Sequence, residues 1–169
     1  MEFQELIRAR RSIRGYRQDP VPDEALGRVL EAARLAPTAA NRQPFRLIIV
    51  TDRSLRERFR EVYDRDWFWS APMIIVGCVD PEAAWQRADG FNAADVDLSI
   101  VMDHVILAAA NEGLGTCWVC NFDEARVKIL LGIPPQVRVV AMTPLGFPAA
   151  DPRPFLRKSL DELVRRERW

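Results

Sequence analysis

The chain has 169 residues, of which 49% are apolar and 28% are charged, so it can bury a sizeable core and does not have the composition of a disordered protein. Its 24 basic and 24 acidic residues give a formal net charge of zero, which argues against a generally basic nucleic-acid binder. All but two of the 24 basic residues are arginines, whose planar fork of donors suits phosphate and carboxylate groups.

The first half of the chain predicts three helices and two strands. Residues 2–11 carry apolar side chains at helical spacing, and a second helix begins at Pro22, with acids in its first turn. Short β-branched runs predict strands over residues 46–51 and 72–79, separated by a charged surface helix over 55–63. The second run is apolar enough for a strand that is covered on both faces.

Residues 95–112 form the most apolar helical segment. Apolar side chains occupy almost every side of a helical wheel drawn for this segment, so we expect a helix that is buried all round. In a chain of this length, one face of the helix can pack on a sheet, and a partner subunit is the simplest cover for the other face.

The remaining elements alternate between strands and helices, which predicts one domain over residues 1–169 with an α+β or mixed-sheet, three-layer arrangement. No G-x-G-x-x-G motif follows a predicted strand, which argues against a Rossmann nucleotide site. In chain order these elements are a strand at 116–119, a helix from 122–124 to Gly132, a strand at 137–142, a turn-rich stretch at 143–148 and a capping-box helix at 159–168.

The sequence favours a cytoplasmic protein without a membrane partner. The N-terminal stretch lacks the apolar segment and the small-residue cleavage site of a secretory signal. The longest clean apolar run, residues 72–79, is far shorter than the ~20 residues that a membrane span requires. An odd number of cysteines, three, agrees with a reducing compartment.

Residues 8–17 form the first stretch whose side chains suggest a function. The chain leaves a helix here and enters an extended segment, in which alternate residues share a face. Arg10, Ser12 and Arg14 would then lie on one side and could hold an anion. A solvated basic face is the alternative interpretation.

Residues 36–45 form the second stretch, a loop bounded by prolines and built mainly of small and amide side chains. Small side chains let main-chain N–H groups approach a ligand, and Asn41 and Gln43 could fix the loop or bind a ligand edge. An ordinary turn between a helix and a strand would explain the same composition.

Cys117 and Cys120 form an isolated C-x-x-C in the third stretch. A metal site would need two further ligands, and Cys78 and His104 are the only other cysteine and histidine in the chain. On a strand, Cys117 and Cys120 would point to opposite faces, so we expect structural cysteines and no metal. We expect His104 to be a satisfied core or interface residue, because it shares no helix face with the neighbouring Asp103.

Five segments, taken together and in this order, resemble the FMN-dependent nitroreductase superfamily, and the resemblance covers nearly the whole chain. It implies an α+β three-layer sandwich, with a mixed, mostly antiparallel sheet flanked by helices. It also implies an intertwined homodimer that has two FMN sites at the subunit interface and the helix over 95–112 at its centre. The segments are RRSIRGY (10–16, followed by Pro20–Val21), APTAANRQPF (36–45), GLGTCW (113–118), PLGFP (144–148) and RKSLDELV (157–164).

The resemblance also implies which residues contact FMN. Arg10, Arg11 and Ser12 resemble phosphate and ribityl contacts, Arg157 would join them at the phosphate, and Arg14 resembles the cation beside the pyrimidine side of the ring. The two net-positive ends of the chain, residues 1–20 and 151–169, would thus meet at one phosphate. The resemblance further implies contacts from the partner's loop, at Pro37, Thr38, Ala39 and Asn41, and from Val119 and Cys120 near flavin N5.

Two features differ from the family pattern. Cys120 stands where a small residue is common, and residues 61–92 contain no match to the family's variable ring-contacting and lid segment. Within that segment, Trp67, Phe68 and Trp69 could stack on a planar substrate. A local core cluster is the alternative role for these three rings.

The resemblance therefore implies an FMN-dependent oxidoreductase that passes hydride from NADH or NADPH, through the flavin, to a small electron-poor acceptor of nitroaromatic or quinone type in a ping-pong cycle. The flavin supplies its own reactivity, so such an enzyme needs no catalytic triad. Reductive dehalogenation or flavin fragmentation on the same fold is one alternative, and a non-enzymatic flavin-binding protein is another. We do not expect a nucleic-acid partner, because residues 21–150 are net acidic.

Overall fold

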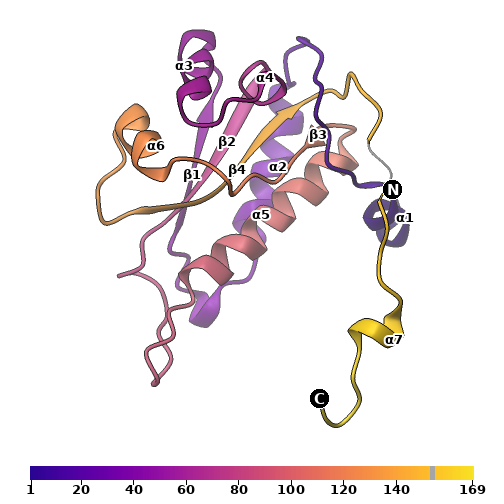
Figure 1. The fold of residues 1–169 in the computed structure, drawn as a ribbon, viewed down its shortest axis with the longest axis vertical. Coiled ribbons are helices and arrows are strands. Elements are labelled where there is room, and N and C mark those ends of the chain that lie inside the picture. Colours follow the sequence, from indigo (N-terminus) through magenta and orange to yellow (C-terminus); the bar gives the residue numbers. More distant parts are fainter. Residues whose placement is uncertain (153–154) are drawn as a thin grey trace.

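The computed structural model describes residues 1–152 and 155–169 and contains a four-stranded sheet with helices on both faces (Figure 1). The strand order is β1-β2-β4-β3, and every neighbouring pair is antiparallel. The sheet is therefore not mixed, and the described residues add one isolated parallel bridge, between Ser12 and Thr116. The strands are β1 (Phe45–Val50), β2 (Met73–Val79), β3 (Gly115–Thr116) and β4 (Arg138–Gly146).

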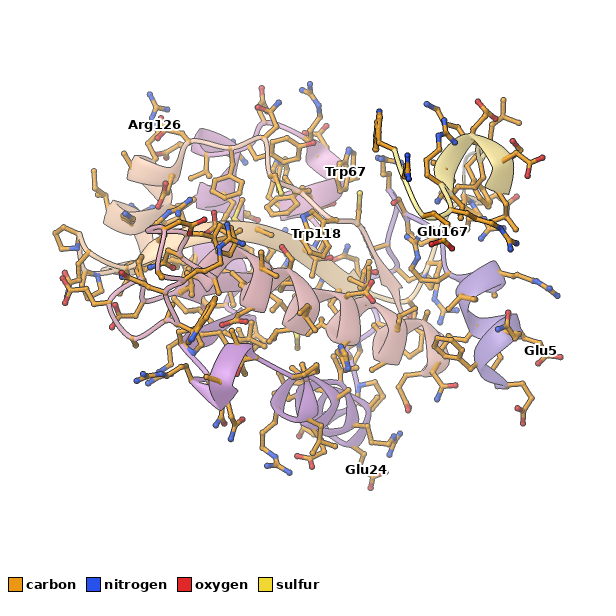
Figure 2. All side chains as sticks on the ribbon, turned by 90° about the horizontal axis from the view of Figure 1, so that it is seen from below. Glu5, Glu24, Trp67, Trp118, Arg126 and Glu167 are labelled. Carbon is orange, nitrogen blue, oxygen red and sulfur yellow. The ribbon has the colours of Figure 1, made fainter. Side chains whose placement is uncertain are left out.

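Helices cover the sheet in two layers, which confirms the predicted α+β three-layer arrangement. Figure 2 shows these layers on opposite sides of the molecule, at Glu24 and Arg126. One layer consists of α2 (Asp23–Leu35) and α5 (Ala94–Asn111), and the other of α3 (Arg53–Arg58), α4 (Asp66–Trp69) and α6 (Glu124–Leu131). The shorter elements are α1 (Phe3–Ala9), α7 (Leu160–Leu163) and the 3-10 helices η1 (Ala39–Asn41) and η2 (Phe59–Glu61).

Strand β2 is buried at every position, as predicted for a strand covered on both faces. Because side chains alternate along a strand, Ile75 packs with α2 and α5, whereas Ile74 packs with the helices on the other face. Gly77 permits the close approach of α5, since a Cβ atom there would lie only 3.1 Å from the Met102 sulfur.

Helix α5 is buried on one face only within this chain. Leu98, Val101 and Val105 are fully enclosed, but Val96 is 48% exposed, and Ile100 is only half-buried. This agrees with the prediction that the sheet covers one face of the helix, and the predicted cover of the other face by a partner subunit stays a prediction. Its second apolar face is not covered by the part of the chain that the structure describes.

Several element boundaries also differ from the prediction, and the strand expected at 116–119 forms only over Gly115–Thr116. The helix expected over 55–63 begins earlier, because Asp52 caps it by accepting the Leu55 N–H at 2.8 Å, and it ends as η2. Strand β4 continues through the stretch expected to be turn-rich, up to Gly146. The C-terminal helix forms its predicted capping box but is only four residues long. It buries no side chain that would extend it.

Among the described residues, no helix is both long enough and apolar enough to cross a membrane.

Candidate functional site

The arginine-rich segment, residues 8–17, lies along β3 at the edge of the sheet. The Ile13 N–H donates to the Thr116 carbonyl at 2.8 Å, and Ser12 and Thr116 form the parallel bridge. Further along, Tyr16 bridges Pro148 in the segment that follows β4. Three of the five family-like segments therefore meet at this edge.

Gly115 allows the arginine-rich segment to lie this close to β3. A Cβ atom on Gly115 would lie 2.8 Å from the nearest side-chain carbon of Ile13, which is too short for any real contact. Within the segment, the Tyr16 hydroxyl donates to the Ile13 carbonyl at 2.7 Å. Burial raises the pKa of this phenol, so it stays protonated and keeps donating at neutral pH.

Arg10, Ser12 and Arg14 all lie near Cys117, the residue that follows β3. All three act on the buried thiol of Cys117: burial raises the pKa of this thiol, and the charge of Arg14, a hydrogen bond with Ser12 and the charge of Arg10 oppose the rise. Two guanidinium groups and a hydroxyl in this arrangement can bind an anion such as a phosphate.

Arg11 extends in a different direction. Its guanidinium donates to the main-chain carbonyls of Arg8 and Arg10 and lies 4.0 Å from the centre of the Phe155 ring. Arg157 lies 4.3 Å from the centre of the same ring. The structure thus brings Arg11 and Arg157 together around Phe155.

Arg10 and Arg11 also line a hollow of about 290 Å³. The hollow lies beside the C-terminal end of α5, because Ala110, in the last turn of that helix, forms part of its wall. The arginine-rich segment is therefore placed at one end of α5.

The loop at residues 38–43 has an unusual backbone. Ala40, Asn41 and Gln43 have φ angles of 50°, 53° and 51°. The left-handed region costs roughly 1–2 kcal/mol for a residue with a Cβ atom, and less for asparagine. Such a loop needs contacts that hold it, and one is the hydrogen bond from the Gln43 N–H to the Thr38 hydroxyl, at 3.1 Å.

A second contact fixes this loop to α5. The Ala39 N–H donates to Asp97 Oδ1 at 2.8 Å. Asp97 lies in the first turn of α5 and Ala110 in the last, so at ~1.5 Å of rise per residue the two positions are about 20 Å apart. Within one chain, the loop and the arginine-rich segment thus lie at opposite ends of α5 (Figure 1).

Cys117 and Cys120 point to opposite sides, as predicted: Cys117 is buried and Cys120 is exposed. Cys120 accepts a hydrogen bond from the indole N–H of Trp118, with 2.8 Å between nitrogen and sulfur. Val119, between them, exchanges two main-chain hydrogen bonds of 2.9 Å with Met142 of β4, which fixes the backbone here. In the described ranges, no group of three or more His, Cys, Asp and Glu side chains is arranged to hold a metal ion.

His104 lies on the partly covered side of α5, and its Nδ1 atom is 3.0 Å from the Ile100 carbonyl of the same helix. This contact agrees with the prediction of a satisfied core or interface histidine.

The three candidate substrate rings have different surroundings. Trp67 is half-buried, and the Arg14 guanidinium lies 5.8 Å from the centre of its ring. Trp69 instead lies under Arg60, at 4.9 Å. Phe68 is 0% exposed and packs in the core, so the prediction that it stacks on a substrate is wrong. Trp67 is therefore the ring that lies beside the arginine-rich segment.

The match to a known family covers the chain from residue 7 to residue 147, which leaves out the family-like segment at 157–164. The sequence profile described as the nitroreductase family matches residues 7–64 and 59–147 of the chain. The chain belongs to the nitroreductase family. It is therefore an oxidoreductase.

Individual relatives are similar over almost the full length of the chain. A protein of Methanothermobacter thermautotrophicus, provisionally named NADH dehydrogenase/NAD(P)H nitroreductase, is 34% identical over 157 aligned positions, covering 90% of this chain and 80% of that protein. The crystal structure of a nitroreductase family protein from Clostridium difficile 630 superposes with a TM-score of 0.93 at 32% identity, covering 100% of both chains. Iodotyrosine deiodinase 1 of Rattus norvegicus is 24% identical over 202 aligned positions, which cover 96% of this chain and 68% of that protein.

Sequence reasoning did not single out Asp97, which holds the loop. Its pattern in the sequence is no different from that of Asp95 and Asp103 on the same helix. Asp97 is 1% exposed, so it does not belong to a solvated face.

Proposed function

We propose that this chain is an FMN-dependent oxidoreductase that takes hydride from NADH or NADPH and passes reducing equivalents to a small electron-poor acceptor of nitroaromatic or quinone type. The observation that carries the proposal is the pairing of the arginine-rich segment with β3, at Ser12 and Thr116, beside a hollow of about 290 Å³ that Arg10 and Arg11 line. Two guanidinium groups and a hydroxyl fit a phosphate with its attached ribityl chain.

Each of these side chains has a role in binding and orienting FMN. When bound, the flavin supplies the hydride chemistry itself. Arg10 and Ser12 hold the phosphate end, with Arg11 and Arg157 adding positive charge nearby, around Phe155. Arg14 lies toward the ring and stabilises negative charge on its pyrimidine side.

We further propose that each FMN site is shared by two chains of a homodimer. Pro37, Thr38, Ala39 and Asn41, together with the main chain at Val119 and Cys120, complete the proposed contacts. The loop lies about 20 Å from the arginine-rich segment along α5, so a loop from a second copy is better placed to reach the same cofactor. A two-fold axis through the uncovered faces of two α5 helices would set the first turn of one helix beside the last turn of the other.

The exposed apolar surface supports this dimer. Val96 on α5 is 48% exposed. In the C-terminal arm, residues 155–169, Leu156 and Trp169 are 95% and 106% exposed. Figure 1 shows this arm, which carries α7, extending away from the rest of the chain. A second copy would cover both apolar surfaces, and residues 1–169 would then act as one domain of a cytoplasmic dimer.

Trp67 is the proposed wall of the acceptor site. Its ring lies beside Arg14, so a planar acceptor on the flavin could contact the ring edge or face.

Reductive dehalogenation is the second candidate function, because the chain is similar to iodotyrosine deiodinase 1 over 96% of its length. The two candidates share the flavin and differ in the acceptor. A halogenated phenol tested beside a nitroaromatic and a quinone distinguishes them.

The experiment starts from the visible absorption spectrum of the purified protein. We expect a flavin spectrum, rapid bleaching by NADH or NADPH without oxygen, and recovery when a nitroaromatic or a quinone is added. A bound flavin that neither nicotinamide reduces would contradict the enzyme and favour a non-enzymatic flavin-binding protein.

A further inference from the structure

We propose that Asp97 is a positioning residue of the flavin site, which fixes loop 38–43 in the conformation that contacts FMN. The inference rests on the proposed function of that loop. Asp97 would not touch the cofactor, and its carboxylate would act through the main chain of Ala39.

The hydrogen bond between Asp97 and Ala39 is the structural basis. Asp97 Oδ1 accepts the Ala39 N–H at 2.8 Å from within the first turn of α5. Among the described residues, it is the one hydrogen bond that joins residues 38–43 to another element, because the other bonds of this loop stay within it. A rigid helix thus orients a loop that contains three positive φ angles.

The burial of Asp97 indicates that this contact does not serve to stabilise the fold. The residue is 1% exposed, and its second oxygen, Oδ2, is buried without a hydrogen-bond partner among the described residues. A buried carboxylate with one oxygen unpaired costs stability. Fixing the loop accounts for a charge at this place.

Asp95 provides a control for the loss of an acidic charge on the same helix turn. One of its oxygens accepts a hydrogen bond from Arg138 at 3.0 Å, and the other has no partner among the described residues, but its side chain is 46% exposed, unlike that of Asp97. The partner of Asp95 is on β4, however, and not in the loop. Asp95→Ala therefore removes the same charge without releasing residues 38–43.

The test compares FMN binding by Asp97→Ala, Asp97→Asn and Asp95→Ala, each reconstituted from the apoprotein and followed by quenching of flavin fluorescence. We expect the FMN dissociation constant of Asp97→Ala to rise about tenfold, the effect of one lost hydrogen bond. Asp97→Asn, which keeps an oxygen in the same place, should recover most of the affinity, and Asp95→Ala should bind like the wild type.

Two flavin-free measurements separate positioning from a general effect on the fold. In the apoprotein of Asp97→Ala, we expect hydrogen exchange of residues 38–43 to be about tenfold faster than in the wild type. We expect its unfolding temperature to be unchanged or higher, because Ala39 is partly exposed and water can bind its free N–H.

Unchanged exchange in loop 38–43 of Asp97→Ala would overturn the inference whether or not FMN binds. Equal FMN affinity of Asp97→Ala and wild type would also overturn it, as would a joint fall of affinity and unfolding temperature that Asp97→Asn does not rescue. Failure of the wild type to bind FMN, with faster loop exchange in Asp97→Ala, would instead contradict the proposed function and leave Asp97 as the residue that orders the loop.

Discussion

Ile13 and Thr116 are joined by a hydrogen bond of 2.8 Å from N–H to carbonyl, and this bond fixes the register of the arginine-rich segment against β3. With Ile13 turned toward Gly115, Arg10 and Arg11 line the hollow at the end of α5, and the Arg14 guanidinium lies 5.8 Å from the centre of the Trp67 ring. A shift of the register by one residue would move all three arginines.

Gly115→Ala should weaken both FMN binding and the fold. The added methyl group would lie 2.8 Å from Ile13, and relieving such overpacking costs typically ~1–3 kcal/mol. We expect at least a tenfold lower FMN affinity, measured by flavin titration. Gly113→Ala is the control, since it has a positive φ of 73° but open space around its Cβ position. It should cost ~1 kcal/mol in the free energy of unfolding with unchanged FMN affinity.

Arg10→Ala and Arg11→Ala should differ in FMN affinity, although the family resemblance places both arginines at the phosphate. Both arginines line the hollow at the end of α5, but the guanidinium of Arg11 is already bound to two main-chain carbonyls. A charge-assisted hydrogen bond contributes roughly 1.5–3 kcal/mol, so Arg10→Ala should lose FMN affinity by about 10- to 100-fold. The flavin-to-protein ratio after gel filtration measures this loss. A larger loss in Arg11→Ala would show that the phosphate lies nearer to Phe155.

Trp67→Ala should raise the KM of planar acceptors several-fold while FMN stays bound, because Trp67 lies beside Arg14. Steady-state kinetics with a quinone and a nitroaromatic measure the effect. Trp69→Ala is the control. Trp69 lies under Arg60, so this variant should leave the KM unchanged. Equal KM changes in the two variants would count against Trp67 as a wall of the acceptor site.

The free energy of unfolding should decrease between pH 9 and pH 11 because of Cys78. Burial, with a smaller contribution from the charge of Glu124, raises the pKa of this thiol from 9.0 to about 11. The unfolded chain therefore loses this proton first as the pH rises, and stability falls by about 2–3 kcal/mol across that window, with no effect below it. Urea unfolding across this range measures the slope. In Cys78→Val that part of the slope should disappear, and an unchanged slope would contradict the assignment.

Much of the fold could be predicted because local patterns agree with tertiary packing. The apolar run at 72–79, for example, forms the central strand β2, which is buried at every position. The C-terminal helix could not be placed correctly, because a capping box starts a helix but buried side chains are needed to extend it, and α7 has none.

The position of Arg11 and the role of Asp97 could not be read from the sequence. Arg11 is turned toward Phe155, a residue distant in the sequence. Asp97 acts through the main-chain N–H of Ala39, and a main-chain group carries no sequence signal. Residues 95–112 are apolar on almost every side, but the described part of the chain covers only one face of α5.

Complementation between two inactive variants tests the shared site most directly. One chain carries Arg10→Ala, the other carries Thr38→Ala with Asn41→Ala, and dimers with one copy of each are isolated by two different tags. If each site joins the arginine-rich segment of one chain to the loop of the other, the mixed dimer has one undamaged site. It should then bind about one FMN, whereas both parent dimers bind little. A mixed dimer that binds no more FMN than its parents would contradict the shared site, because every site built within one chain would carry a damaged half.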